Sequence, residues 1–268
     1  MEPETRRRQE DIAEAFLATK AHEKMWGDGA VEDLKRRHIK EILAGYTDKP
    51  HAGRHLLTVI RKMILAGIDA EWIDFDPSYK LKYRPTYKGW RAWTADELAQ
   101  FEQRWAIGTT PRLVYALALW LGDRRGDIAA LEPESIKGEI VEFAQGKTGR
   151  MLRLPVTPIL RTCLDASDLS GPRVVMTAYG QPFSEKSLTG RFRDWCRQAG
   201  LPDECKLHGL RKTLGKMLAE SGATTRQIMD TLGHTDIKHA ELYSKDAEQE
   251  RLARDGMSAV VRQFQKRG

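Results

Sequence analysis

Two histidines, an arginine and a tyrosine lie close together near the C-terminal end of the sequence. His208 and Arg211 occur in HGLRK, and His234 and Tyr243 occur in LGHTDIKHAELYSK. Arginine offers forked donors to phosphate oxygens, histidine can move protons and tyrosine can act as a nucleophile. Any one of these residues alone is more often structural, so the combination carries the argument.

Two more basic groups extend this set. Arg124 follows an apolar run that ends at Gly122 in GDRRGDIAAL, where a structural pair with Asp127 is the simpler local interpretation. Lys147 lies in QGKTG, whose Gly-Lys-Thr resembles the end of a nucleotide-binding phosphate loop. That loop is excluded, because Val141 stands where it needs glycine and a strand-like segment follows where it needs a helix. Lys147 is then the tip residue of a hairpin.

The six groups together suit one kind of reaction. They are two arginines, a lysine, two histidines and a tyrosine, and the sequence shows no carboxylate cluster suited to magnesium. The signatures of serine hydrolases and zinc enzymes are missing as well. We therefore expect metal-free phosphodiester transfer through a phosphotyrosine, without a cofactor.

The elements that must position these groups are mostly helical. Apolar residues at three- and four-residue spacing predict helices over residues 6–25, 31–45 and 51–67, and Thr94 with Glu97 forms a capping box for a further one. An apolar helix starting at Thr110, a short one around RRGDIAAL and helices near 157–166, 184–199 and 208–220 follow. EIVEFA and RMLRLPV alternate as the strands of a hairpin around QGKTG.

The segment 77–93 separates two parts of the chain. Prolines prevent a helix there, and five basic residues alternate with five tyrosines and tryptophans in the absence of any acidic residue. Bulk charge is a weaker hint, since 44 basic residues against 38 acidic ones give a net charge of only +6. The segment is either a surface for a polyanion or a solvated linker. Its basic residues are Lys80, Lys82, Arg84, Lys88 and Arg91.

Composition limits the remaining possibilities. The three cysteines show no C-x-x-C spacing, which argues against a disulfide framework or a structural zinc site. The N-terminus has no apolar signal-peptide stretch, and the longest apolar run is too short to span a membrane. We expect a cytoplasmic protein that has no membrane partner.

In their order along the chain, these motifs resemble the tyrosine recombinases of the phage integrase family. GDRRGDIAALEPESI resembles the box of the first catalytic arginine, which points to Arg124, with Asp127 as its acidic companion. QGKTGRMLRLPV is similar to the hairpin of the catalytic lysine, here Lys147. HGLRK and LGHTDIKHAELYS match the boxes that carry the remaining catalytic residues. These are His208, Arg211, His234 and Tyr243.

The resemblance also implies an architecture and partners. It implies a mainly α fold with a small antiparallel β-sheet, with a helical core-binding domain over residues 1–88 and a catalytic domain over residues 89–268. It further implies double-stranded DNA attachment sites, four subunits on two duplexes, and a directionality factor as a possible partner. Asp123 departs from the family pattern, which usually has leucine between the glycine and the arginine.

Two other functions stay open at this point. A type IB topoisomerase would use the same chemistry to relax DNA, and a DNA-binding remnant or regulator derived from an integrase would bind without cleaving.

Overall fold

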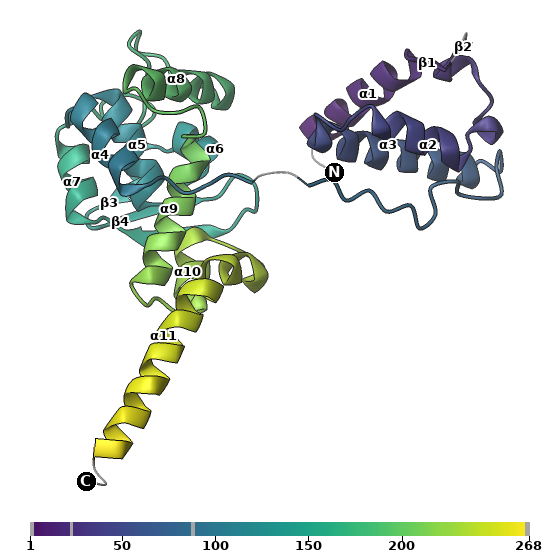
Figure 1. Ribbon diagram of the computed structural model, residues 1–268. Helices are drawn as coiled ribbons and strands as arrows, with labels where there is room; N and C mark the ends of the chain where they lie inside the picture. Colours follow the sequence, from purple (N-terminus) through teal and green to yellow (C-terminus); the bar gives the residue numbers. More distant parts are fainter. Residues whose placement is uncertain (1–2, 22–23, 87–88, 266–268) are drawn as a thin grey trace. The chain divides into compact units, whose positions relative to one another are not determined.

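The chain forms two compact units, residues 1–89 and 90–268 (Figure 1). The computed structural model describes residues 3–21, 24–86 and 89–265. The fold is mainly α with a small antiparallel sheet, as predicted. The expected domain boundary at residue 88 lies outside the described residues, and the role of the first unit as a core-binding domain stays a prediction.

The first unit is a small helical domain. Its elements are α1 (Pro3–Leu17), β1 (Lys20–Ala21), β2 (Lys24–Met25), two 3-10 turns (Trp26–Asp28 and Val31–Asp33), α2 (Arg36–Ala44) and α3 (Pro50–Asp69). Ile39 from α2 and Ile60 and Ile64 from α3 are fully buried in its core. After α3 the chain continues without regular structure, and Leu81 returns to this core.

The first predicted helix was too long. It was expected to reach residue 25, but α1 ends at Leu17 and the chain turns back into the β1–β2 pair. The Thr19 hydroxyl donates to the Phe16 carbonyl at 2.6 Å, and the Trp26 ring stacks on Phe16 with centroids 5.9 Å apart. Burial of two aromatic rings against each other therefore overrides the local helical periodicity.

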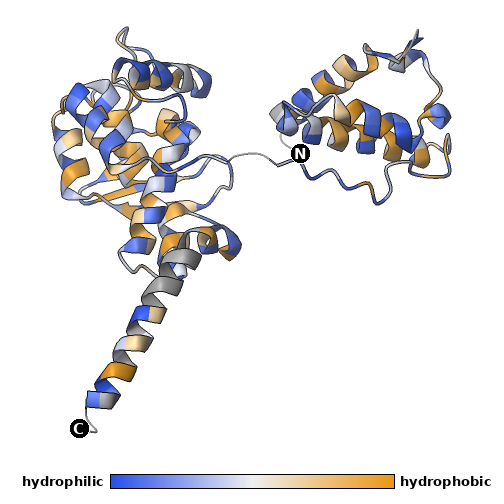
Figure 2. Cartoon of the chain, in the orientation of Figure 1, coloured by the Kyte–Doolittle hydropathy of each residue, from blue (hydrophilic) through white to orange (hydrophobic). Residues whose placement is uncertain are grey.

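The second unit consists of helices around a three-stranded sheet. Its elements are α4 (Ala95–Arg104), α5 (Thr110–Trp120), α6 (Arg125–Ala130), a 3-10 turn (Pro133–Ser135), β3 (Ile136–Lys137), β4 (Ile140–Ala144), β5 (Met151–Pro155), α7 (Pro158–Asp165), α8 (Glu185–Gln198), α9 (Leu207–Glu220), α10 (Thr225–Leu232) and α11 (Ile237–Gln265). Hydrophobic residues concentrate in the packed helices and the sheet (Figure 2).

The sheet has the order β3-β4-β5 and is antiparallel throughout. The predicted hairpin is confirmed: Val141 pairs with Leu154 and Phe143 pairs with Leu152, and all four side chains are buried. Alternate residues of both strands are thereby turned toward the helices. The short β3 strand was not predicted.

Helices α5 and α9 form the centre of the second unit. Nine residues of α5, from Pro111 to Leu119, are buried, as the apolar run predicts. Within the described chain, no helix is both long and apolar enough to cross a membrane.

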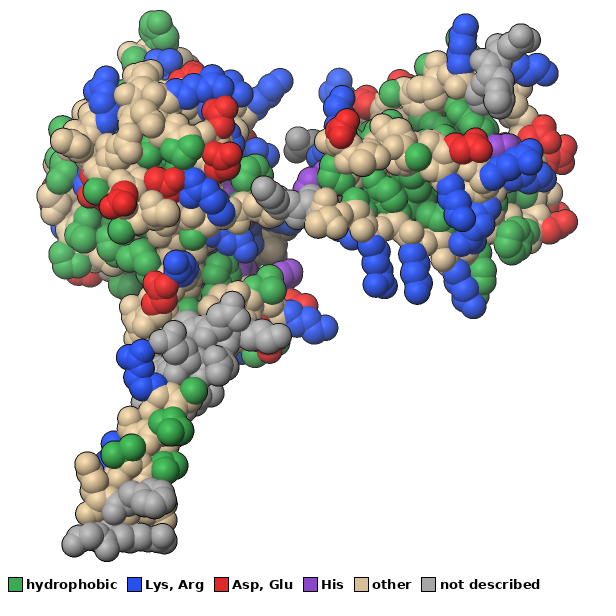
Figure 3. Space-filling view, in the orientation of Figure 1, with side chains coloured by type: hydrophobic (Ala, Val, Ile, Leu, Met, Phe, Trp, Pro, Cys, Tyr) green, Lys and Arg blue, Asp and Glu red, His purple; other side chains and the backbone are tan. Residues whose placement is uncertain are grey.

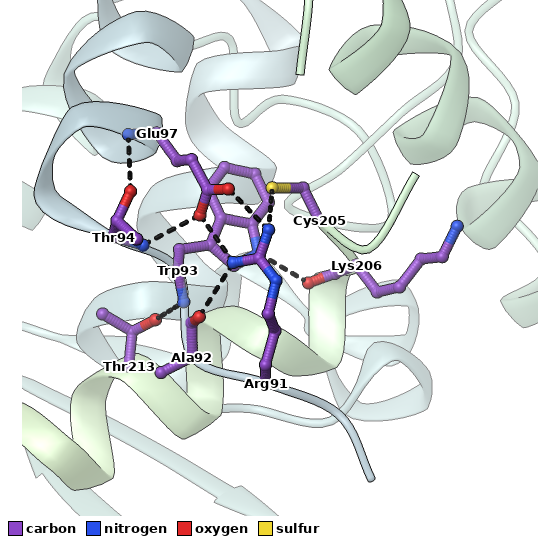
Figure 4. A network of polar contacts seen from close by, with 8 residues as sticks. All are labelled: Arg91, Ala92, Trp93, Thr94, Glu97, Cys205, Lys206 and Thr213. Atoms are coloured by element: carbon purple, nitrogen blue, oxygen red, sulfur yellow. Dashed lines mark hydrogen bonds and ion pairs between the residues drawn. The ribbon is translucent and has the colours of Figure 1, made fainter. Parts of the chain in front are cut away.

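A polar network fixes the entry of the chain into the second unit (Figure 4). Arg91 forms two hydrogen bonds to Glu97, at 2.5 and 2.7 Å, and Glu97 also accepts from the Thr94 amide in the predicted capping box. The Trp93 amide donates to the Thr213 hydroxyl, and its indole donates to the Lys206 carbonyl. Because Lys206 and Thr213 belong to the start and the middle of α9, this network anchors that helix.

Candidate active site

The site begins at the junction between α5 and α6, where the backbone makes a turn that requires glycine. Gly122 has φ +64°, and a Cβ there would come within 2.7 Å of Leu232 and 2.9 Å of Leu214. The chain then extends through Arg124, which is the N-cap of α6 with φ −75° and ψ 152°. The turn thus brings Arg124 close to the end of α10.

Arg211 is buried at the centre of the site, with only 2% of its surface exposed. One terminal nitrogen donates to the Gly122 carbonyl at 2.6 Å and the other donates to the Leu232 carbonyl at 2.5 Å. Burial lowers the pKa of Arg211 to about 10, so it still carries its charge at neutral pH. Two backbone carbonyls thereby fix the charged guanidinium of Arg211. A guanidinium has five N–H donors, so some remain available to bind an anion.

The adjacent arginines of the first motif have different surroundings. The Arg124 side chain is 22% exposed and lies 3.9 Å from Asp127, and its Nη1 is buried with no hydrogen-bond partner among the described residues. The Arg125 side chain is 55% exposed and pairs with Glu185 on α8. These contacts favour Arg124 as the arginine of the site.

Both candidate histidines are half-buried and are held neutral by their surroundings. Burial lowers the pKa of His208 to about 4, and the nearby charges of Arg211 and Lys212 lower it further. Burial likewise lowers the pKa of His234 to about 4, with Arg211 the foremost charge acting on it. Arg124 also acts on both histidines. The groups therefore surround one electropositive space in which an anion is favoured.

Tyr243 lies on the first turns of α11, against His234. The two rings are nearly parallel, with centroids 6.1 Å apart, and the Lys212 ammonium lies 4.6 Å from the tyrosine ring. Gly215 of α9 makes room for it, since a Cβ there would come within 2.6 Å of the ring. The Nδ1 atom of His234 is buried and lacks a hydrogen-bond partner in the described chain.

Lys147 differs from the other candidates because it is exposed at the tip of the β4–β5 hairpin. Its turn is attached to the site indirectly: the Gly146 amide donates to Asp127 at 2.8 Å. The structure thus brings together Arg124, His208, Arg211, His234 and Tyr243, and leaves Lys147 on a neighbouring loop.

Asp123, the departure from the family pattern, is buried beside these groups with 1% exposure. Neither of its carboxyl oxygens has a hydrogen-bond partner within the described residues. Burial and then repulsion from Asp127 raise its pKa well above the ordinary value, while Arg211 and Arg124 act in the opposite direction. Its surroundings therefore disfavour the charged carboxylate relative to an aspartate in water.

The basic residues expected to contact a polyanion divide into three cases. Lys80 and Lys82 line a groove of about 790 Å³ in the first unit, and Arg84 lines a neighbouring one with Lys82. Figure 3 shows Lys and Arg side chains projecting from this unit. Arg91 is instead occupied by Glu97, and Lys88 lies outside the described residues. Contact of any of them with DNA stays a prediction.

Sequence reasoning missed further residues of these surfaces. Arg36 and Lys40 of α2 line the groove of Lys80 and Lys82, and their signal was two basic residues four apart on one helix face. Near the site it missed the buried Gln145 and also Arg150. No pattern in the sequence marks those two, because the Leu232 and His234 carbonyls that they contact lie more than 80 positions away.

The arrangement can bind one tetrahedral anion and place a phenol beside it. The Nη1 atom of Arg124 and the Nδ1 atom of His234 are buried without a hydrogen-bond partner in the described chain, and both residues lie near the charged guanidinium of Arg211. In the described part of the chain, His, Cys, Asp and Glu side chains form no group of three that could hold a metal ion.

Comparison with known proteins shows the family to which the chain belongs. The model of the phage integrase family matches residues 92–250, which is more than half of the chain. The integrase of Mycobacterium phage FRAT1 is 24% identical over 261 residues, covering 85% of this chain and 76% of that protein.

Two solved structures have a similar fold. A lambda integrase dimer bound to a COC′ core site matches with a TM-score of 0.78 and 21% identity, over 91% of this chain and 89% of that one. A lambda integrase tetramer bound to a Holliday junction matches with a TM-score of 0.76 and 20% identity, over 88% of this chain and 73% of that one.

Proposed function

Because this chain belongs to the phage integrase family of tyrosine recombinases, we propose that it is a site-specific DNA recombinase whose nucleophile is Tyr243. One observation carries the proposal beyond the family. Arg211, Arg124 and two neutral histidines surround an electropositive space, and the Tyr243 ring lies against one of those histidines. A phenol beside a group of anion-binding side chains supports attack of Tyr243 on a bound phosphodiester.

The cleavage step assigns a role to each group. Arg211 and Arg124 hold the two non-bridging oxygens of the scissile phosphate, and His208 and His234 add hydrogen bonds and can take the tyrosine proton. The Tyr243 oxygen bonds to phosphorus as the bond from phosphorus to the 5′ oxygen breaks, and Lys147 protonates that leaving oxygen. The product is a 3′-phosphotyrosine and a free 5′ hydroxyl.

Rejoining reverses the same step with a different strand. A 5′ hydroxyl from the partner duplex attacks the phosphotyrosine, and Tyr243 regains its proton as it leaves. The phosphotyrosine preserves the energy of the phosphodiester, so the reaction needs no nucleotide cofactor. The positive charge around the phosphate comes from arginine and lysine side chains, so cleavage is expected to proceed in EDTA.

The first unit and the linker would bind the duplex through phosphates. The basic grooves lined by Arg36, Lys40, Lys80, Lys82 and Arg84 support this role, because phosphate contacts supply most of the affinity and position the protein. The DNA-bound lambda integrase dimer and tetramer support double-stranded attachment sites and four subunits on two duplexes.

The far part of α11 is suited to contact between subunits. Met257, Val260 and Val261 are exposed apolar residues there, and docking on a neighbouring subunit would cover them. A directionality factor that biases integration against excision, and the role in moving a mobile element, belong to the same proposal.

Covalent trapping tests the function. The protein is mixed, in EDTA, with a library of nicked genomic fragments from the source organism, in which the broken strand lets the 5′ end diffuse away. We expect a covalent protein–DNA adduct that enriches one sequence, and no adduct with Tyr243→Phe.

The rivals give different results in the same assay. A protein that only binds DNA shifts the fragments without an adduct. A type IB topoisomerase forms an adduct and relaxes supercoiled DNA, but does not join the cut strand to a second duplex. An adduct that requires magnesium contradicts the proposed mechanism.

A further inference from the structure

The loop that carries Lys147 is a short turn whose internal hydrogen bonds shape its backbone but do not attach it to the rest of the site. β4 ends at Ala144 and β5 begins at Met151, and Gln145 and Arg150 close the turn because the Gln145 amide donates to the Arg150 carbonyl at 2.9 Å. Lys147 lies between Gly146 and Gly149, and Gly149 has φ +65°. Because Lys147 is exposed at the end of this turn, contacts that hold the turn against the site decide where a general acid at this position would lie.

Arg150 connects this turn to the segment that carries His234. One terminal nitrogen of Arg150 donates to the His234 carbonyl at 2.5 Å, and the other donates to Asp230 at 2.7 Å. Its hydrogen bond is also the first cause of the lowered pKa of Asp230, so the pair is charged on both sides. The guanidinium thus bridges the end of α10 and the turn before α11.

Gln145 makes a second connection from the other side of the turn. Its side chain is completely buried, its amide nitrogen lies 3.4 Å from the Leu232 carbonyl, and its amide oxygen accepts from the Thr148 hydroxyl at 3.0 Å. The same Leu232 carbonyl accepts the hydrogen bond from Arg211. Position 233, next to Leu232, requires glycine, because a Cβ at this position would come within 2.5 Å of the Gln145 side-chain amide.

We propose that Arg150 is a positioning residue that holds the Lys147 turn against the His234 segment, so that the leaving-group acid and the phosphate-binding groups meet at one phosphate. The proposal rests on the proposed function, which makes Lys147 the acid. Arg150 touches neither Lys147 nor the expected phosphate. Its effect acts through the turn, whose other anchors are Gln145 and the hydrogen bond from Gly146 to Asp127.

Removal of Arg150 should leave the fold intact. Its side chain is partly exposed and Asp230 keeps a second partner in Arg226, at 3.0 Å. Ion pairs of this exposure contribute little to stability. Arg150→Ala is therefore expected to affect the rate of cleavage more than the unfolding temperature.

A substrate with a sulfur leaving group separates positioning of the acid from other defects. The trapped duplex is made with sulfur in place of the bridging 5′ oxygen at the cleaved position. A thiolate leaves without being protonated, because the pKa of a thiol is about 8.5 and therefore far below that of an alcohol. Lys147→Ala should then be slow on the oxygen substrate and close to wild type on the sulfur substrate.

Arg150→Ala should show the same pattern. We expect cleavage of the oxygen duplex to slow by about 10- to 100-fold, the scale for misplacing a catalytic group by about 1 Å, and cleavage of the sulfur duplex to stay near the wild-type rate. Arg150→Lys should recover part of the rate, because an ammonium can still reach one acceptor. Arg153→Ala is the matched control, since Arg153 lies three residues further along the chain, on β5, and pairs with Glu142; its rates should equal wild type on both duplexes.

The outcomes test the role of Lys147 as the acid and the role of Arg150 as the positioning residue separately. If Lys147→Ala is not rescued by sulfur, the proposed role of Lys147 is wrong and the positioning of that acid is overturned with it. If Lys147→Ala is rescued and Arg150→Ala is equally slow on both duplexes, only the inference about Arg150 is overturned. Wild-type cleavage of the oxygen duplex by a folded Arg150→Ala protein overturns it as well.

Discussion

The depressed pKa values of His208 and His234 lead to a prediction about DNA binding. Each imidazole has a pKa of about 4 in the free protein, because burial and nearby cations disfavour its protonated form. A phosphodiester would bring a negative charge into the same space. At a distance of about 5 Å and an effective dielectric constant of about 20, its attraction for a protonated imidazole is about 3 kcal/mol, or roughly two pKa units.

The two histidines should therefore titrate near pH 6 in the complex. Between about pH 4 and pH 6 the complex binds protons that the free protein does not, so DNA affinity should rise as the pH falls through this window and change little above it. The free protein behaves in the opposite way. Its stability should fall as pH drops from about 6.5 to about 4, because unfolded histidine takes up a proton that the buried one refuses.

Histidine ring signals in NMR spectra measure these values directly. The Tyr243→Phe protein avoids cleavage, and His208→Gln and His234→Gln identify the two signals. The titration is run free and with the trapped duplex, and high salt, which releases the DNA, should restore the free values. Free histidines that titrate near 6.5, or values that the duplex leaves unchanged, would refute the anion site.

Three further predictions follow from the site and the linker. Tyr243→Phe should keep DNA affinity and lose the covalent adduct, because only the phenolic oxygen is removed; a phosphotyrosine peptide that maps to another tyrosine contradicts the assignment. Arg124→Ala should slow single-turnover cleavage by about 10²- to 10³-fold, the scale for one oxyanion donor, whereas Arg125→Ala should change it little; the reverse order shifts the first motif by one residue. Changing the described basic linker residues to Gln should lower the slope of log affinity against log salt by roughly 0.9 per lost phosphate contact, and an unchanged slope makes this segment an ordinary solvated linker. These residues are Lys80, Lys82 and Arg84.

Local signals in the sequence predict the elements that depend on local chemistry. The capping box at Thr94 and Glu97 is present with both hydrogen bonds, and the alternation in EIVEFA and RMLRLPV gives the β4–β5 register. Periodicity fails where a distant contact decides, as at Leu17, where stacking of Trp26 on Phe16 ends the helix. A helical repeat of apolar residues is equally compatible with a chain that turns back to bury them.

The residues of the site also divide into those that local sequence signals mark and those that depend on distant contacts. Groups proposed to act directly on a phosphate have diagnostic types and spacing, so Arg211 and Tyr243 could be proposed from the sequence. Groups that act through other residues have no such requirement. Arg150 gains its role only because folding brings the His234 carbonyl, 84 positions away, within 2.5 Å of its guanidinium.

Asp123 is another residue whose properties depend on its surroundings in the fold and cannot be predicted from the sequence. In the sequence it is an acidic residue directly before Arg124, where the family pattern usually has leucine. Burial bears on its charge, because a carboxyl with 1% exposure and a raised pKa carries a negative charge less readily than an aspartate in water. The surroundings act differently on each group of this site: Arg211 keeps its charge at neutral pH although it is buried, whereas burial disfavours the charged form of Asp123. In the proposed function, the scissile phosphate supplies the anion that Arg124 and Arg211 would bind together.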